Sequence, residues 1–146
     1  MNINAHVFKA CEQAISRFYA RLDGLEAGPV GAMFAADGVW HRQGAVLRGG
    51  AAVDAALAQR PAGRRSAHLI SNLFFNAQDD LQIRASYLLQ VFRHDAGPEA
   101  DPRDAAPIAS SLLAITRTED LYQRAGNGEW MLLNKQSRPL FTQSGA

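Results

Sequence analysis

The sequence predicts an α+β fold in which a curved antiparallel sheet wraps around a long N-terminal helix. Apolar residues recur at steps of three and four near the start of the 146-residue chain, which indicates one long amphipathic helix. From residue 65 onward the pattern alternates with a period of two, which indicates strands. Tight turns separate these strands, and strands joined by tight turns are antiparallel, so the pattern excludes a doubly wound nucleotide-binding fold.

The first half of the chain is predicted to hold three helices and one short hairpin. Glycine ends the first helix, and proline can occupy the first position of the second because that N–H has no helical partner. Arg60-Pro61 ends the third helix, since the residue before proline is disfavoured in helical geometry. The expected elements are helix 7–22, helix 29–37, strands 39–42 and 45–48, and helix 51–59.

The second half is predicted to form long strands that complete one domain over residues 1–146. The expected strands are 65–77, 81–91, 108–124 and 129–138, with a proline-rich loop over 96–107 and a hairpin turn at Gly126-Asn127-Gly128. A curved sheet around a helix leaves a cavity on its concave face. Alternation places His68 and Asn72 on one face of the first of these strands, and Trp130, Leu132 and Asn134 on one face of the last.

Composition and charge exclude several classes of function. Fifteen basic residues oppose fourteen acidic ones, so no electrostatic footprint for nucleic acid or an anionic membrane is expected. No apolar run approaches the roughly 20 residues of a membrane helix. The lone Cys11 excludes an internal disulfide and fits a reducing compartment. The first residues show no secretory-signal pattern, and we therefore expect a cytoplasmic protein.

Four phrases in the sequence resemble one known family. They are FYARLDG at 18–24, MFAADGVW at 33–40, the pair Gly49-Gly50 before a helix, and HLISN at 68–72. In this order they are similar to the SnoaL-like branch of the nuclear-transport-factor-2-like superfamily. The resemblance implies a cone-shaped fold with a deep apolar pocket and a homodimer formed through the sheet. Members include polyketide cyclases, dehydratases, isomerases, binding proteins and small subunits of ring-hydroxylating dioxygenases, so the fold does not fix the function.

The active-site plans of the family can be compared with this chain. The oxyanion-stabilising tyrosine of ketosteroid isomerases falls at Phe18, whose ring cannot donate a hydrogen bond. Their carboxylate base falls near Arg42, whose guanidinium cannot accept a proton, so this plan is absent. The aspartate and histidine of scytalone dehydratase-like enzymes match Asp23 and His68. The second histidine of that plan has no counterpart near Tyr87.

Asp23 and His68 are therefore the candidate catalytic residues. A carboxylate fixes the tautomer of a neighbouring histidine and raises its basicity, so that it can remove a proton from carbon beside a carbonyl. The alternative is that Asp23 caps a turn and His68 is a structural histidine. The candidate substrate-binding residues are Tyr19, Phe34, Trp40, Asn72 and Tyr87. Alternation predicts that Trp40 faces the pocket and His41 faces away.

The remaining residues predict no metal and no cofactor. The four histidines and the single cysteine lack ligand spacing, and Gly49-Gly50 lacks the lysine of a phosphate loop. Arg60, Arg64 and Arg65 could attract an anionic substrate or a partner chain, or form a solvated loop.

Together these observations favour a cofactor-independent dehydratase, isomerase or cyclase acting on an apolar or aromatic carbonyl compound. The alternatives are a non-catalytic subunit like those of the dioxygenases and a ligand-binding protein without turnover.

Overall fold

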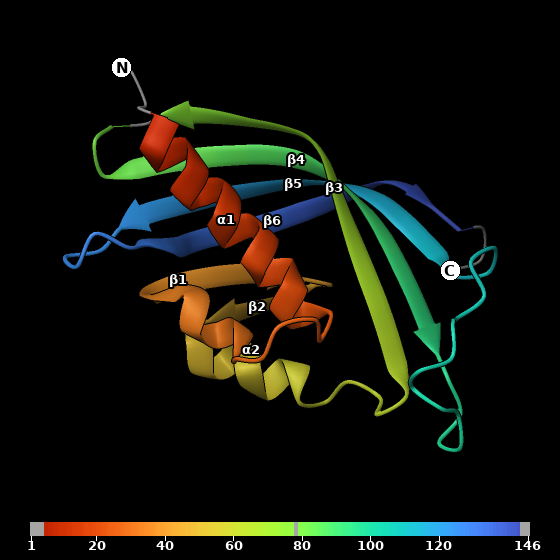
Figure 1. Cartoon of the computed structure of the whole chain (residues 1–146). Coiled ribbons are helices and arrows are strands. Elements are labelled where there is room, and N and C mark those ends of the chain that lie inside the picture. Colours follow the sequence, from red (N-terminus) through yellow and green to blue (C-terminus); the bar gives the residue numbers. More distant parts are fainter. Residues whose placement is uncertain (1–4, 78, 144–146) are drawn as a thin grey trace.

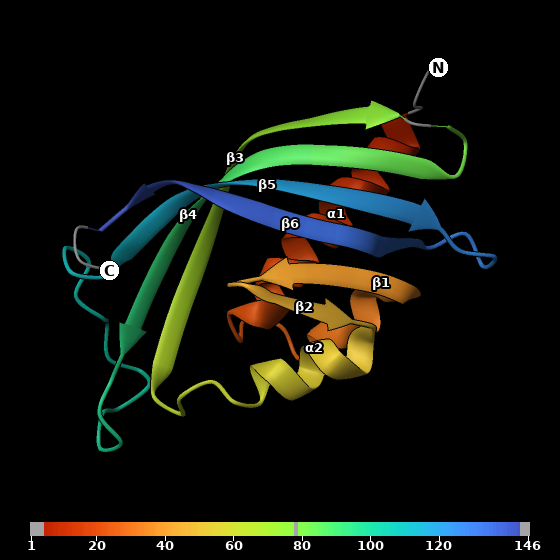
Figure 2. The same cartoon turned by 180° about the vertical axis from the view of Figure 1, so that it is seen from behind.

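A computed structural model describes the chain over residues 5–77 and 79–143. Figure 1 shows α1 lying across one face of a curved sheet, and Figure 2 shows the same molecule from behind. The elements are α1 (Ala5–Leu22), η1 (Val30–Met33), β1 (Phe34–Arg42), β2 (Ala45–Arg48), α2 (Gly50–Leu57), β3 (Arg64–Ala77), β4 (Gln82–Asp95), β5 (Leu112–Arg124) and β6 (Trp130–Thr142). None of the helices in these two ranges is long and apolar enough to cross a membrane.

The six strands form one sheet in the order β2-β1-β6-β5-β4-β3. Neighbouring strands are antiparallel except β1 and β6, which run parallel and pair Trp40 with Lys135. The sequence predicts an antiparallel sheet, whereas the observed sheet is mixed. The reason is that β1 and β6 are far apart in the sequence, so no tight turn fixes their relative direction.

The predicted second helix is reduced to the single 3₁₀ turn η1. The chain becomes extended at Phe34, which pairs with Leu132 of β6. The Phe34 ring is stacked against the Trp40 ring and lies edge-on to the Phe18 ring, with centroids 6.2 and 6.1 Å apart. Pairing with the sheet and burial of this ring therefore override the local helical pattern.

The glycine pair Gly49-Gly50 places α2 against η1. Gly49 has a φ of 82°, which favours glycine, and a Cβ on Gly50 would collide with the backbone carbonyl of Gly31. Asp54 then accepts a hydrogen bond from the Gly31 N–H at 2.8 Å. These contacts fix α2 beneath β1 and β2, as Figures 1 and 2 show.

The inner face of α1 supplies much of the core. Its buried residues are Cys11, Ile15, Phe18 and Tyr19. Burial raises the pKa of the Cys11 thiol to about 12, so this thiol stays protonated and packs as a small apolar group.

Strands β3 and β6 each contain a β-bulge or similar irregularity that changes which residues face inward. In β3 the register shifts between Ser71 and Phe74, and Asn72 has a φ of 55°. His68 lines the inner cavity, whereas beyond the bulge Leu73 packs on the core. The extra residue thus reverses the alternation, as bulges do.

Candidate functional site

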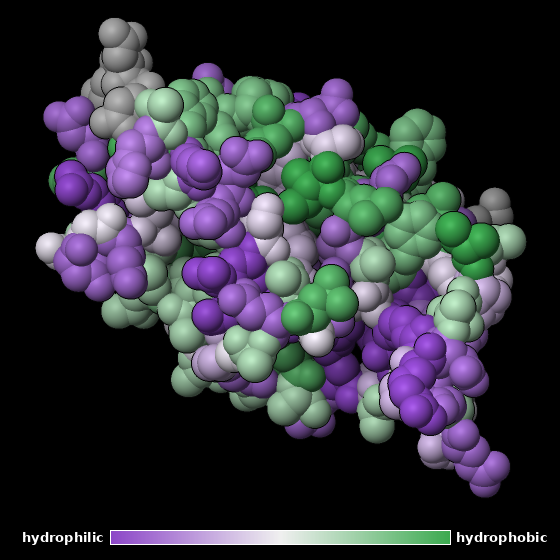
Figure 3. Space-filling view, in the orientation of Figure 1, coloured by the Kyte–Doolittle hydropathy of each residue, from purple (hydrophilic) through white to green (hydrophobic). Residues whose placement is uncertain are grey.

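A cavity of about 670 Å³ opens between the end of α1 and the curved sheet. Its walls are mostly apolar or aromatic, but several basic side chains also border it. The lining residues include Tyr19, Leu22, Trp40, Val46, His68, Leu89, Val91, Leu113, Lys135 and Pro139. In Figure 3, hydrophilic residues gather at the lower right of the molecule, where the end of β4 and the following loop lie. This volume suits a small organic molecule.

His68 lines this cavity and is hydrogen-bonded to Asp23, which is not itself a lining residue. The Nδ1 atom of His68 lies 2.7 Å from Oδ1 of Asp23, and the backbone N–H of His68 donates to Oδ2 at 2.9 Å. Ser66 donates a further hydrogen bond to Oδ1 at 2.7 Å. The side chain of Asp23 is 5% exposed and that of His68 is 12% exposed. The carboxylate is therefore held by several donors and in turn orients the imidazole.

Local structure explains how this pair forms. Asp23 comes directly after α1, and its N–H still donates to the carbonyl of Tyr19 at 2.9 Å. Arg60 donates to the carbonyl of Leu22 at 2.8 Å and to Ser66 Oγ at 3.0 Å, which ties the end of α1 to the start of β3. Asp23 and His68 are thus held by the end of α1 and the start of β3, which Arg60 joins.

The environment keeps Asp23 ionised. Burial alone would raise the pKa of this carboxyl, but the hydrogen bond and charge of His68 and the hydrogen bond of Ser66 together lower it below its ordinary value. When the imidazole is neutral, its hydrogen bond to the carboxylate places the single ring proton on Nδ1 and leaves the lone pair on Nε2. Among the described residues, no hydrogen-bond partner of Nε2 is found.

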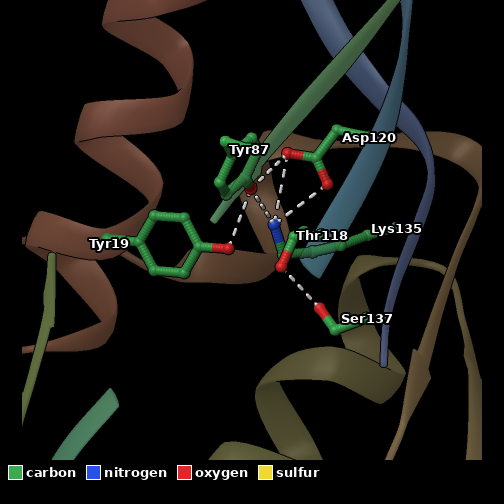
Figure 4. A network of polar contacts seen from close by, with 6 residues as sticks. All are labelled: Tyr19, Tyr87, Thr118, Asp120, Lys135 and Ser137. Atoms are coloured by element: carbon green, nitrogen blue, oxygen red, sulfur yellow. Dashed lines mark hydrogen bonds and ion pairs between the residues drawn. The ribbon is translucent and has the colours of Figure 1, made fainter. Parts of the chain in front are cut away.

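A buried polar network lies beside this pair and begins at Tyr19. The Tyr19 ring lies 5.1 Å from the His68 ring, and its hydroxyl lies 2.8 Å from that of Tyr87. Tyr87 donates to Asp120 at 2.6 Å, and Lys135 Nζ donates to Tyr87 at 2.8 Å and to Asp120 at 3.0 Å. Figure 4 shows these side chains converging from α1, β4, β5 and β6.

The number of protons available in this network determines which hydroxyl is the donor in each hydrogen bond. The single hydroxyl proton of Tyr87 goes to Asp120, so Tyr19 is the donor between the two phenols. Burial raises the pKa of both Tyr19 and Tyr87, and the phenols stay protonated at neutral pH. Burial would lower the pKa of Lys135, but the charge of Asp120, together with the interactions with Tyr19 and the hydrogen bond to Asp120, outweighs it, and the net shift of the pKa is upward. Lys135 therefore carries a positive charge 4.7 Å from the centre of the Tyr19 ring.

The predicted substrate-binding residues have different positions. Tyr19 and Trp40 line the cavity. Tyr87 is buried behind Tyr19, and Phe34 is buried in the core against Trp40, so neither is a lining residue. Asn72 is exposed, because the bulge in β3 turns it away from the face of His68, and the prediction that the two share a face is wrong.

His41 shows that a strand end can depart from simple alternation. Trp40 is buried and His41 is exposed, as predicted, but both border the cavity because β1 ends there. The His41 ring contacts Asn134 at 3.2 Å.

Sequence reasoning missed Lys135 and Asp120. Alternation groups Asn134 with the buried Leu132, but the register shift between β5 and β6 leaves Lys135 buried instead. One signal was available: Asp120 and Lys135 stand at nearly equal distances from the turn at 126–128 and form a directly opposed pair across the hairpin. In the part of the chain that the structure describes, no group of three His, Cys, Asp or Glu residues could hold a metal ion.

Comparison with solved structures places the fold among known proteins. The chain is similar to Aln2 from a Streptomyces species, with a TM-score of 0.73, 19% identity and coverage of 95% of this chain and 94% of that one. A protein from Catenulispora acidiphila in complex with S-DNPA gives a TM-score of 0.69 and 16% identity over 93% and 95% of the two chains. The hexachlorocyclohexane dehydrochlorinase LinA-type3 from Novosphingobium barchaimii gives 0.71 and 12% over 94% and 90%.

These likenesses confirm the predicted cone-like α+β fold, which is also that of a cystatin-like protein from Nostoc punctiforme. No curated protein matches the chain. The model of the SnoaL-like domain matches residues 7–135. The fold agrees with this match, and the chain therefore belongs to the SnoaL-like family.

Proposed function

We propose that this protein is a cofactor-independent enzyme that moves a proton at the carbon next to a carbonyl group. The reaction would be a dehydration, isomerisation or cyclisation of an apolar, aromatic carbonyl compound. The observation that carries the proposal is that His68, which lines a cavity of about 670 Å³, is hydrogen-bonded to Asp23. A base oriented by a carboxylate inside an apolar cavity is suited to general base catalysis.

In the first step, Nε2 of His68 removes a proton from the carbon beside the carbonyl. The electron pair of that C–H bond forms a carbon–carbon double bond, and the carbonyl π electrons move to oxygen to give an enolate. Asp23 stabilises the imidazolium that results. The proton then returns to another carbon in an isomerisation or leaves with a hydroxyl group as water in a dehydration.

Tyr19 and Lys135 supply the stabilisation that the enolate oxygen requires. At rest the Tyr19 proton points to Tyr87, a neutral acceptor. An oxyanion in the cavity is a stronger acceptor, so the proton turns toward it as negative charge develops. The ammonium of Lys135 lies close to the Tyr19 ring and favours the same charge. The interaction is thus stronger in the transition state than with the bound substrate.

The structural neighbours support small-molecule chemistry in this fold. One was solved in complex with S-DNPA, and another is a dehydrochlorinase.

The test is deuterium exchange at carbon next to the carbonyl in a panel of aromatic ketones, followed by NMR in heavy water. We expect His68→Ala to slow exchange by roughly 10²–10⁴-fold while ligand binding survives. His94→Ala is the matched control, because His94 lies on β4 and does not line this cavity. Unchanged exchange in His68→Ala would contradict the mechanism. Binding without exchange would favour the alternative of a binding protein without turnover.

We also propose that the protein forms a homodimer through the sheet. Leu69, Gln90, Ile115 and Phe141 are paired in one row across β3, β4, β5 and β6. Leu69 is 51% exposed and Phe141 is 67% exposed. Ile115 is half-buried and Gln90 is polar, so the exposed apolar side chains lie at the two ends of the row. Exposed apolar side chains on one face of a sheet are typical of a protein interface.

A further inference from the structure

Four arginines border the cavity and form what we call the arginine rim: Arg42, Arg60, Arg64 and Arg93. They come from the end of β1, the segment before β3, the start of β3 and the end of β4. Among the described residues that line the cavity, none is a carboxylate. An otherwise mostly apolar cavity therefore carries a concentration of positive charge at its border.

Two of these arginines are hydrogen-bonded to other groups of the protein. Arg64 makes two hydrogen bonds to Asp95, at 2.7 and 3.0 Å. Arg60 donates to the Leu22 carbonyl and to Ser66. These two side chains hold the backbone of the rim in place.

The other two arginines keep their donors available. The Arg42 guanidinium lies 5.3 Å from the centre of the Trp40 ring, and in the described part of the chain neither Arg42 nor Arg93 forms an ion pair with a carboxylate within 4 Å. Burial lowers the pKa of Arg42, and the charges of Arg60 and Arg64 lower it further. The four arginines thus outnumber Asp95, the carboxylate that pairs with Arg64, and an anion that enters the cavity would relieve the repulsion felt by Arg42.

We propose that the arginine rim binds a carboxylate of the substrate through Arg42 and Arg93. This inference rests on the proposed function, because it names the substrate class of the same site. The substrate is then an aromatic ketone that carries a carboxylate, with its carbonyl group near Tyr19 and His68 and its acid group at the rim. The planar guanidinium suits a carboxylate because both can form two parallel hydrogen bonds.

The experiment compares acetylnaphthoate with its uncharged methyl ester by calorimetric titration at low and high salt. Both ligands carry the same ketone and ring system, so the difference in affinity reports the charge. We expect the acid to bind about tenfold more tightly than the ester at low salt, and the advantage to shrink at high salt.

Variants then assign the preference to the rim. Arg42→Gln and Arg93→Gln should each remove most of the preference for the acid and leave affinity for the ester within about twofold, whereas Arg42→Lys should retain part of it. The matched control is Arg84→Gln, which removes one charge from β4 at a position outside the cavity. Arg84→Gln should leave both affinities unchanged, and circular dichroism should show that every variant is folded.

The outcomes separate this proposal from the proposed function. Equal affinity for acid and ester, failure of the acid to bind, or a preference that survives both glutamine variants would overturn the rim as a carboxylate site. His68-dependent deuterium exchange of the ester would still support the proposed function in that event. An acid preference that depends on Arg42, without exchange of either ligand, would support the rim and contradict the proton-transfer chemistry.

Discussion

Lys135 is a charged side chain buried between the core and the cavity, with 2% of its surface exposed. It is paired with Asp120, which is also buried, and lies 4.3 Å from the centre of the Phe18 ring. Removing charges from water is costly, and the pair is tolerated because Tyr87 and Asp120 satisfy the ammonium. The burial of Lys135 therefore requires Asp120, and the burial of Asp120 requires Lys135.

Replacing Lys135 by methionine should therefore destabilise the protein by about 3–5 kcal/mol, because Asp120 is left buried without its counter-charge. Urea unfolding followed by circular dichroism measures the change. The double variant Lys135→Met with Asp120→Asn should recover part of the loss. A loss below about 1 kcal/mol in the single variant would show that Asp120 does not depend on this partner.

Asp23 makes stability depend on pH in the acid range. Hydrogen bonds from His68 and Ser66 hold the pKa of this carboxyl below its ordinary value in spite of burial. A group whose pKa is lower in the folded state stabilises the fold above its unfolded pKa of about 3.9, and this contribution is lost as pH falls through the folded pKa.

Wild type should thus lose more free energy of unfolding between about pH 5 and pH 3 than Asp23→Asn, which has no carboxyl at this position. Urea denaturation at each pH provides the comparison. Parallel curves for the two proteins would mean that the Asp23 contacts contribute nothing to pH dependence.

At the scale of elements, the irregularities in β3 and β6 decide which predictions succeed. The period-two pattern is correct for His68 because it stands before the bulge in β3, and it fails for Asn72, which stands within it. In the same way, alternation groups Asn134 with Leu132, while the structure buries Lys135. A bulge depends on how a strand pairs with its neighbour. The residue pattern of one strand alone does not determine that pairing, so it cannot predict the bulge.

The predictions of α1 and of the hairpin turn at 126–128 depended on stronger local signals. The amphipathic pattern of α1 and the turn at 126–128 fix the elements around them, and the resemblance added the pairing of Asp23 with His68, whose hydrogen bond the structure shows. The arginine rim was only partly foreseen, since Arg42 and Arg93 reach it from strands distant in sequence.

Asn72 offers a test of the bulge. Its φ of 55° is tolerated by asparagine but is costly for a β-branched residue, so Asn72→Val should destabilise by about 1–2 kcal/mol. Asn76→Val on the same strand is the control and should be neutral or slightly stabilising, because Asn76 is exposed and in ordinary strand geometry. Equal effects of the two substitutions on the urea midpoint would argue against the bulge.

At the scale of the whole molecule, the sheet separates two surfaces that carry different sets of residues. The concave face carries the cavity with Asp23 and His68, and the opposite face carries the row of Leu69, Ile115 and Phe141. A proposed dimer through the outer face would leave the cavity of each copy open to its ligand.

Phe141→Glu should convert the dimer to a monomer, because the substitution places a charge in the apolar row. Sedimentation velocity measures the change in mass. Glu99→Ala, in the loop after β4, is a control that should leave the dimer intact. A monomeric wild type would contradict the proposed dimer and would leave the cavity chemistry unaffected.

The proposed chemistry requires that His68 present an unprotonated Nε2 to a ligand in the cavity while Nδ1 donates to Asp23. The most direct measurement is the ¹⁵N NMR spectrum of the His68 ring, recorded without ligand and with acetylnaphthoate. We predict that the neutral ring carries its proton on Nδ1 and has a bare Nε2, and that the Nε2 resonance shifts when the ligand binds. A neutral ring with its proton on Nε2, or ring resonances that the bound ligand leaves unchanged, would contradict the proposed role of His68.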